Sequence, residues 1–292
     1  MSSSIVLKLA NRGLLNWMSD ELFLKTKYRA VFGKKLNLES PETYNEKLQW
    51  LKLHDRKPEY IKLVDKYEVK KIIADKIGEE FIIPTLAVWD KPDDIDIGVL
   101  PNQFVLKCTH DSGGLSICLD KALFDLNSAK KKLADAFKHN YFWNGREWPY
   151  YHVKPRIIAE QYMKDKLTDE LRDYKFFCFD GVVKALFIAS DRQKDVDTKF
   201  DFYSDKGEHL DIRQGHPNAD MIPPLPVNFE KMKELASVLS KGFAQVRVDF
   251  YEVNGNIYFG ELTLFHFDGM TPFIPDEWDH AFGSYIDLHK AL

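Results

Sequence analysis

The sequence predicts an α+β fold in which helices come first and antiparallel hairpins follow. Helical capping signals occupy the first ~95 residues, whereas apolar spacing from residue 104 onward has the two-residue period of strands. Asp-Gly and Asn-Gly dipeptides between alternating segments are typical hairpin signals. Single helices stand between these hairpins instead of alternating with every strand, so a doubly wound parallel sheet is not expected.

Four helices are predicted from their end signals, over residues 38–54, 65–78, 127–140 and 228–243. Their expected N-caps are Ser40, Asp65, Asn127 or Ser128, and Asn228. Pro41 fits the first position of the first helix, and Gly78 fits the residue just past the second. Strands are expected over 104–108, 115–120 and 156–163, and hairpins over 174–190 and 199–213. The Pro/Asp/Gly-rich stretch 92–102 is predicted to be a linker.

Composition excludes several classes of protein. The 292 residues include 41 basic and 45 acidic side chains with no dominant basic run, so no nucleic-acid partner is predicted. No apolar run approaches the ~18 residues of a transmembrane segment, and no secretory signal is recognised. The cysteines Cys108, Cys118 and Cys178 cannot all pair with one another, which favours reduced thiols and a cytoplasmic location. Residues 5–18 form either a core helix or a peripheral membrane contact.

A glycine-rich hairpin tip is the first candidate for chemistry. In "FVLKCTHDSGGLSICL", Lys107 leads into a tip made of His110, Asp111, Ser112, Gly113 and Gly114. Glycines let backbone N–H groups approach phosphate oxygens closely. A strand follows the glycines, so the stretch is neither a Walker A loop nor a dinucleotide-binding turn. The alternative is a plain surface turn.

Two further positions are weaker candidates. Lys66 stands beside the expected N-cap Asp65, where the helix dipole disfavours a cation but favours a phosphate shared with it. An exposed lysine that tolerates the small penalty is the alternative. Glu160, in the strand "RIIAEQYM", lies where an adenine could pair with backbone groups, although a plain strand end explains the stretch equally.

In the hairpin "VRVDFYEVNGNIYFGELT", the number of residues in the connection decides whether the polar residues of the two strands share one face. Arg247 and Asp249 share one face of their strand, as do Glu261 and Thr263 on theirs. A strict two-residue Asn-Gly turn would put Asp249 and Glu261 on opposite faces, whereas a three-residue or bulged connection would bring all four together. If they converge, the carboxylates suit Mg²⁺ with substrate phosphates, and Arg247 neutralises charge. The alternative is a salt-bridged solvent face.

These stretches, in this order, resemble the ATP-grasp superfamily and most closely its TupA-like branch of teichuronopeptide biosynthesis. The matching stretches are "LVDKYEVKK", "FVLKCTHDSGG", "IIAEQYM", "RDYKFFCFDG" and "QVRVDFYEVNGNIYFGELT", within residues 41–275. The resemblance implies two α+β subdomains with antiparallel sheets that clamp ATP, preceded by a small helical segment. The expected boundaries are 1–95 for that segment, 96–160 for the lid subdomain with the Gly-rich loop, and 161–292 for the subdomain with the metal site.

The resemblance also implies roles for individual residues. Lys66 and Lys107 resemble the lysines that contact the nucleotide phosphates, and residues 109–114 resemble the loop that closes over them. Glu160, Gln161 and Tyr162 resemble the adenine-binding hinge. The implied Mg²⁺ ligands are Asp249, Glu261 and Thr263, and the implied phosphate or substrate contacts are Arg247, Lys175 and Arg192. The superfamily usually has Asn where Thr263 stands.

The implied activity is that of an ATP-dependent carboxylate–amine ligase with ATP and Mg²⁺ as cofactors. ATP would convert a carboxylate to an acylphosphate, which an amine then attacks to form an amide. In this branch the implied acid is a uronic acid of a capsule or cell-surface polysaccharide precursor, and the amine is an amino acid or a related amine. One alternative is an enzyme of the same pathway that transfers a sugar from a metal-bound sugar nucleotide. Another is a non-catalytic binding module. Oligomeric state is not predicted.

Overall fold

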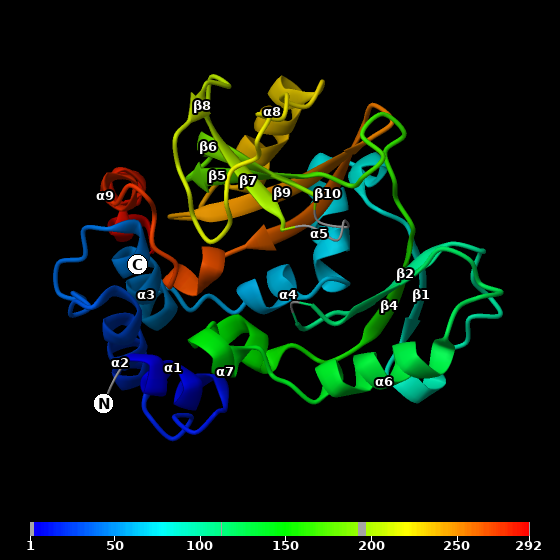
Figure 1. The fold of residues 1–292 in the computed structure, drawn as a ribbon, viewed down its shortest axis with the longest axis horizontal. Coiled ribbons are helices and arrows are strands. Elements are labelled where there is room, and N and C mark those ends of the chain that lie inside the picture. Colours follow the sequence, from blue (N-terminus) through cyan, green and yellow to red (C-terminus); the bar gives the residue numbers. More distant parts are fainter. Residues whose placement is uncertain (1–2, 112, 192–196, 292) are drawn as a thin grey trace.

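The computed structural model describes residues 3–111, 113–191 and 197–291 and contains two antiparallel sheets surrounded by helices (Figure 1). The α-helices are α1 (Ser3–Asn11), α2 (Asp20–Phe32), α3 (Tyr44–His54), α4 (Tyr60–Val64), α5 (Glu68–Ile77), α6 (Leu126–Phe137), α7 (Phe142–Gly145), α8 (Phe229–Leu239) and α9 (Glu277–Ser284). Short 3-10 helices are η1 (Glu79–Phe81), η2 (Pro92–Asp94), η3 (Trp148–His152), η4 (His266–Gly269) and η5 (Leu288–Ala291). Within these ranges no helix combines the length and apolarity that crossing a membrane requires.

The smaller sheet has the strand order β1-β4-β2-β3. Its strands are β1 (Thr85–Trp89), β2 (Phe104–Cys108), β3 (Leu115–Cys118) and β4 (Ile157–Gln161). Helix α6 covers one face, where Leu133 packs against Phe104 and Ile157 in a separate apolar core. Strand β1 was not expected from the sequence, which predicted a mostly helical segment before residue 96. It pairs with β4 at the sheet edge and is half-buried at every position, so it lacks the clear alternation of a strand.

The larger sheet has the order β10-β9-β5-β6-β7-β8. Its strands are β5 (Asp173–Phe179), β6 (Val182–Ser190), β7 (Lys199–Ser204), β8 (His209–Leu210), β9 (Val246–Val253) and β10 (Asn256–Thr263). Helix α8 packs on one face, where Phe229 stacks on Phe176. This arrangement confirms the predicted hairpins and the α+β fold.

Helices α1 and α2 form a third core, which includes Phe23, Tyr28 and Leu36. The chain then passes through α3, α4 and α5, and Figure 1 shows α4 and α5 between the two sheets. The exposed side chains of Ile5, Leu14 and Trp17 remain at the N-terminal end of the molecule. All three cysteines are buried free thiols.

Two predicted helix starts were displaced. Ser40 and Pro41 precede α3 by several residues, because Thr43 caps it in a reciprocal capping box with Glu46. Asp125, rather than Asn127 or Ser128, caps α6 and accepts a hydrogen bond from the backbone N–H of Ser128.

The other two helices begin close to the predicted residues. Asp65 accepts hydrogen bonds from the backbone N–H groups of Tyr67 and Glu68, but the helix begins at Glu68 with Tyr67 at the N-cap position, so the predicted N-cap lies two residues too early. Asn228 holds the N-cap position of α8, but its side chain bonds to Glu252 instead of to the helix.

Candidate active site

The polar face of the β9–β10 hairpin is created by a β-bulge and not by its turn. Asn254 and Gly255 form a two-residue turn with φ values of 52° and 80°, so Asn256 faces Val253 in odd-sum register. Of the two connections that the sequence left open, a three-residue loop or a bulge, the structure has the bulge. The register shifts between Phe259 and Glu261, after which Glu261 lies opposite Asp249 and Thr263 lies opposite Arg247.

The same bulge allows apolar residues on both sides of it in β10 to face the core. Phe259 lies opposite Phe250 on the side of the core, whereas after the bulge Leu262 lies opposite Val248 on that side. A side chain on Gly260, the extra residue, would approach the Asp249 carbonyl oxygen and the Tyr251 ring to 3.2 Å each. Glycine therefore permits the close approach that the bulge requires.

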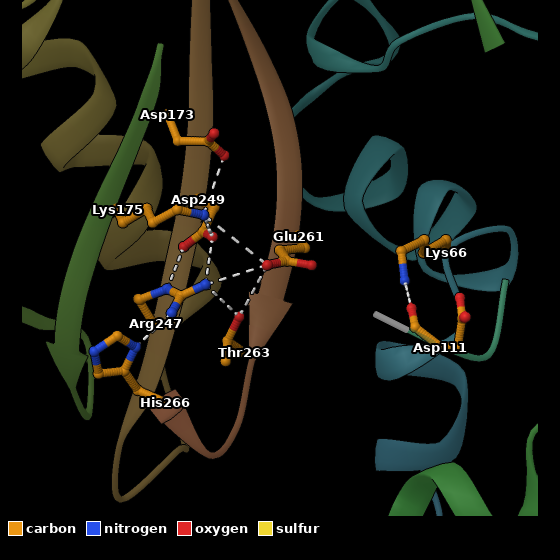
Figure 2. A network of polar contacts seen from close by, with 9 residues as sticks. All are labelled: Lys66, Asp111, Asp173, Lys175, Arg247, Asp249, Glu261, Thr263 and His266. Atoms are coloured by element: carbon orange, nitrogen blue, oxygen red, sulfur yellow. Dashed lines mark hydrogen bonds and ion pairs between the residues drawn. The ribbon is translucent and has the colours of Figure 1, made fainter. Parts of the chain in front are cut away.

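Arg247 is the centre of the resulting network (Figure 2). Its Nε and Nη2 atoms each donate a 2.7 Å hydrogen bond to Asp249, which makes a bidentate pair. Nη2 also donates to Glu261 at 3.1 Å and to Thr263 at 2.9 Å. Nη1 lies 2.5 Å from His266 Nδ1. These contacts commit the guanidinium to the protein and fix the four predicted residues together.

Lys175 closes the network on the cleft side. It pairs with Asp249, which lies directly across from it on β9, and its Nζ is 3.1 Å from Asp173 and 4.0 Å from Glu261. Asp249 is completely buried, whereas 43% of the Glu261 side chain is exposed. Burial raises the pKa of Glu261, but Lys175 and Arg247 together lower it to about 2. Glu261 is therefore an ionised carboxylate that faces the cleft, and Asp249 lies behind the Lys175 ammonium.

His266 is a buried member of the network that the sequence did not reveal. Burial first, and then the charges of Arg247 and Lys175, lower its pKa well below the ordinary range. The ring is therefore neutral: Nδ1 accepts from Arg247, and Nε2 donates to the Gln214 side-chain oxygen at 2.9 Å. Neither residue belongs to a motif, so only the folded chain brings them to the site.

A second charged cluster lies on the smaller sheet. Glu160 is buried and bridges two lysines, with Nζ–Oε distances of 2.6 Å to Lys107 and 2.6 Å to Lys70. Burial raises the pKa of Glu160, but the two lysines lower it to about 2. Lys70 was missed in the sequence; it lies in the first turn of α5, whereas Lys66 precedes the helix. Glu160 thus holds two lysines in place at the cleft.

The glycine-rich tip reaches over the cleft from the β2–β3 hairpin. Lys66 Nζ donates to the backbone carbonyl of Asp111, which joins the start of α5 to the tip. Gly113 has a φ of 114°, and a Cβ on Gly114 would lie 2.6 Å from the Asp111 carboxylate and 2.8 Å from Ala136. The His110 ring packs edge-on against Phe137 of α6 and does not line the cleft, contrary to prediction. Ser112 and Arg192 lie outside the described residues.

These groups line one continuous cleft between the sheets. At one end are Ile83, Val105, Met163, Leu171 and Tyr251, beside the predicted Glu160, Gln161 and Tyr162. The middle is charged and contains Lys66, Lys70, Lys107, Asp111, Lys175 and Glu261. The far end is lined by Arg247, Thr263, Glu147, Tyr150, Phe200 and Phe267. An apolar end, a cationic middle and a polar far end follow one another along it.

The side chains that line the cleft match the chemistry of ATP and Mg²⁺. The apolar end suits a planar base, and the three lysines with the glycine-rich tip suit phosphates. Glu261, Asp249 and Thr263 carry hard oxygen atoms of the kind that Mg²⁺ prefers, and Glu261 faces the cleft whereas Asp249 lies behind Lys175. The set contributes two carboxylates and one hydroxyl, and the described residues contain no group of three or more His, Cys, Asp or Glu that could hold a metal ion. The residues present therefore fit both ATP and Mg²⁺.

Comparison with solved structures found similar chains. D-alanine–D-alanine ligase from Bacillus anthracis in complex with ATP is 16% identical over 78% of this chain and 64% of that one, with a TM-score of 0.44. The Helicobacter pylori D-alanine–D-alanine ligase is 13% identical over 84% and 69%, with a TM-score of 0.43. The ATP-grasp ligase PsnB with minimal precursor, Mg and ADP is 10% identical over 96% and 74%, with a TM-score of 0.42. This chain therefore spans less than two thirds of the Bacillus anthracis ligase.

Comparison with curated proteins gave no match. A family model described as TupA-like ATPgrasp matches residues 46–287, which is most of the chain. The match confirms the family and the ATP-grasp fold predicted from the sequence. The chain belongs to the TupA-like ATP-grasp family.

Proposed function

We propose that this protein joins a carboxylate to an amine at the expense of ATP, with a uronic acid of a cell-surface polysaccharide precursor as the acid. One observation carries the ligase part of the proposal. The bulge at Gly260 turns Glu261 and Thr263 to the face of Arg247 and Asp249, opposite Lys66 and the glycine-rich tip across one cleft. The sugar acid rests on the family resemblance alone.

The three lysines hold the phosphates in this proposal. Lys66 is attached to the tip by the Asp111 carbonyl, so a phosphate that attracts its ammonium also draws the tip toward the cleft. Lys107 and Lys70 keep fixed positions because Glu160 holds both. Fixed cations that face the place where charge develops stabilise phosphoryl transfer without reorganising during the reaction.

Glu261, Asp249 and Thr263 would hold Mg²⁺, which would neutralise phosphate charge when bound. Arg247 keeps these oxygens on one face through its bonds to all three. Lys175 both contacts Asp249 and lines the charged middle of the cleft, so it is placed to contact the transferred phosphoryl group. The closed tip excludes water, which protects an acylphosphate from hydrolysis.

The proposal is tested by incubating the protein with Mg-ATP, a panel of amino acids and uronic acids, and measuring ADP. ADP release that needs both an acid and an amine supports the ligase, and Glu261→Gln should reduce it at least ~100-fold. The exposed Glu39→Gln is the matched control and should retain activity. Binding of a sugar nucleotide in preference to Mg-ATP would instead favour the glycosyl-transferring alternative.

A further inference from the structure

We propose that Glu147, together with Tyr141 and Tyr150, forms the site that binds the ammonium group of the amine substrate and accepts its proton. This inference rests on the ligase function proposed above and names the residue that would activate the nucleophile. It is carried by the place of Glu147 in the cleft, by the pairing of its neighbours and by the rigidity of its segment.

The far end of the cleft connects Glu147 to the site of phosphoryl transfer. The same cavity is lined by Glu147, Tyr141 and Tyr150 and by Lys175 and Glu261 of the polar network. An amine bound at Glu147 therefore shares one space with a carboxylate activated beside Lys175. Aromatic faces of the kind that line this cavity also attract a cation.

Glu147 is a buried carboxylate whose neighbouring cations are already engaged. It is 4% exposed, and no ion pair or side-chain hydrogen bond joins it to any other described residue. Lys27 and Lys52 lie nearby, but both pair with Asp268. An ionised carboxylate in such a place is costly unless it has a partner, so a positively charged ligand would remove the cost.

The electrostatics of this place agree with a proton-accepting role. Burial and the nearby Asp268 raise the pKa of Glu147 to about 8, against the opposing effect of Lys52 and Lys27. Glu261 raises it further. The charge of Glu147 and burial in turn raise the phenol pKa values of Tyr141 and Tyr150, so both tyrosines stay protonated. A base with a pKa near the working pH is well matched to an amine.

The segment that carries Glu147 is held rigidly. The preceding Arg146 is 1% exposed, and its guanidinium lies over the rings of Phe23 and Trp143 at 4.4 and 4.7 Å. Lys52 donates a 2.8 Å hydrogen bond to the carbonyl of Gly145. A Cβ on Gly145 would collide with Asp268 at 1.7 Å, so the chain approaches that carboxylate as closely as glycine allows. A fixed carboxylate can position as well as deprotonate.

The step balances without any further reactant. The ammonium gives one proton to the Glu147 carboxylate, and the neutral amine attacks the acyl carbon of the acylphosphate. A C–N bond forms. The bond between the acyl carbon and the oxygen that bridges it to phosphorus breaks, and its electron pair leaves with inorganic phosphate. The second N–H proton of the tetrahedral intermediate goes to the departing phosphate, and Glu147 returns its proton to solvent.

Hydroxylamine separates amine activation from acid activation, because it is largely uncharged at neutral pH and needs no ammonium site. The full chain would be assayed with Mg-ATP and uronic acids, with either an amino acid or hydroxylamine as the nucleophile. Glu147→Gln should lower amide formation ~100-fold or more and raise the KM for the amino acid. Hydroxamate formation should stay within ~3-fold of wild type, and Glu39→Gln should change neither.

Equal loss of both products in a folded, ATP-binding Glu147→Gln protein would overturn the proposal, as would unchanged amide formation. If the wild type makes neither product, the proposed function fails, and binding still tests the site. Ligand-observed NMR in Mg-AMPPNP should then detect free amino acids, but not their N-acetyl forms, on wild type and not on Glu147→Gln. Equal binding to both proteins would refute the ammonium site.

Discussion

Asp249 and Glu261 lie directly opposite each other across β9 and β10, although the turn that connects their strands has only two residues. The pairing depends on the extra residue Gly260, which moves every later side chain of β10 to the other face. The proposed metal-binding face is thus a property of one bulge.

Gly260→Ala tests the bulge. The added Cβ would contact the Asp249 carbonyl and the Tyr251 ring at 3.2 Å, which we expect to destabilise the protein by about 1–3 kcal/mol. Chemical denaturation measures this change, and Mg-ATP affinity should fall with it because Asp249 and Glu261 lose their alignment. Unchanged stability and affinity would show that the bulge accommodates a Cβ at position 260.

Thr263 offers a paired test of the metal set. Thr263→Asn restores the amide usual in the superfamily and should keep Mg²⁺-dependent ADP formation within a few-fold. Thr263→Val has nearly the same shape but removes the hydroxyl that accepts from Arg247, so activity should fall roughly 10–100-fold. Titration of activity against Mg²⁺ separates weaker metal binding from slower chemistry. Equal activity of the two variants would exclude Thr263 from the metal site.

Glu160 should make the stability depend on pH in the acid range. Its pKa of about 2 in the folded chain is below the ordinary 4.5, so its stabilising contribution is present above pH 4.5 and is lost as the pH falls toward 2. Glu160→Gln leaves Lys70 and Lys107 without their buried partner and should cost about 3–5 kcal/mol near neutral pH. Denaturation from pH 7 to 3 should give a flatter profile for the variant than for wild type.

Glu147 should act on stability in the opposite direction. Its folded pKa of about 8 exceeds the ordinary 4.5, so its favourable contribution is complete below pH 4.5 and is lost as the pH rises through 8. Glu147→Gln removes this loss, and its Tm relative to wild type should rise between pH 5 and pH 9. A difference that stays constant over that range would contradict the raised pKa.

The neutral state of His266 is directly observable. Because its folded pKa lies well below the ordinary 6.5, the ring should remain the Nε2–H tautomer at pH 5 in ¹⁵N NMR spectra. The unfolded chain takes up a proton there, so His266 destabilises the fold as the pH falls below 6.5. A protonated ring at pH 5 would place like charges on His266 and Arg247 and would refute the network.

Sequence patterns predicted the element order well, since alternation and turn dipeptides are local signals. They also placed Arg247 with Asp249, and Glu261 with Thr263, on one face of each strand, because side chains alternate along a strand. They did not locate the bulge, because a glycine between Phe259 and Glu261 fits several registers.

Other parts of the site depend on contacts between distant segments. Lys70 is recognisable only beside Glu160, which lies ninety positions away. His266 and Glu147 carry no motif and acquire their properties from burial, which the local sequence does not encode.

Arg146 connects a segment inside the family match to a segment outside it. It lies within residues 46–287, but its guanidinium donates to the carbonyls of Asn16 and Met18 and rests on Phe23, all of which precede that range. The N-terminal helices thus brace the residue next to Glu147. The shape of the proposed amine pocket therefore depends on a segment outside the family match, whereas the residues proposed to hold the nucleotide all lie within it.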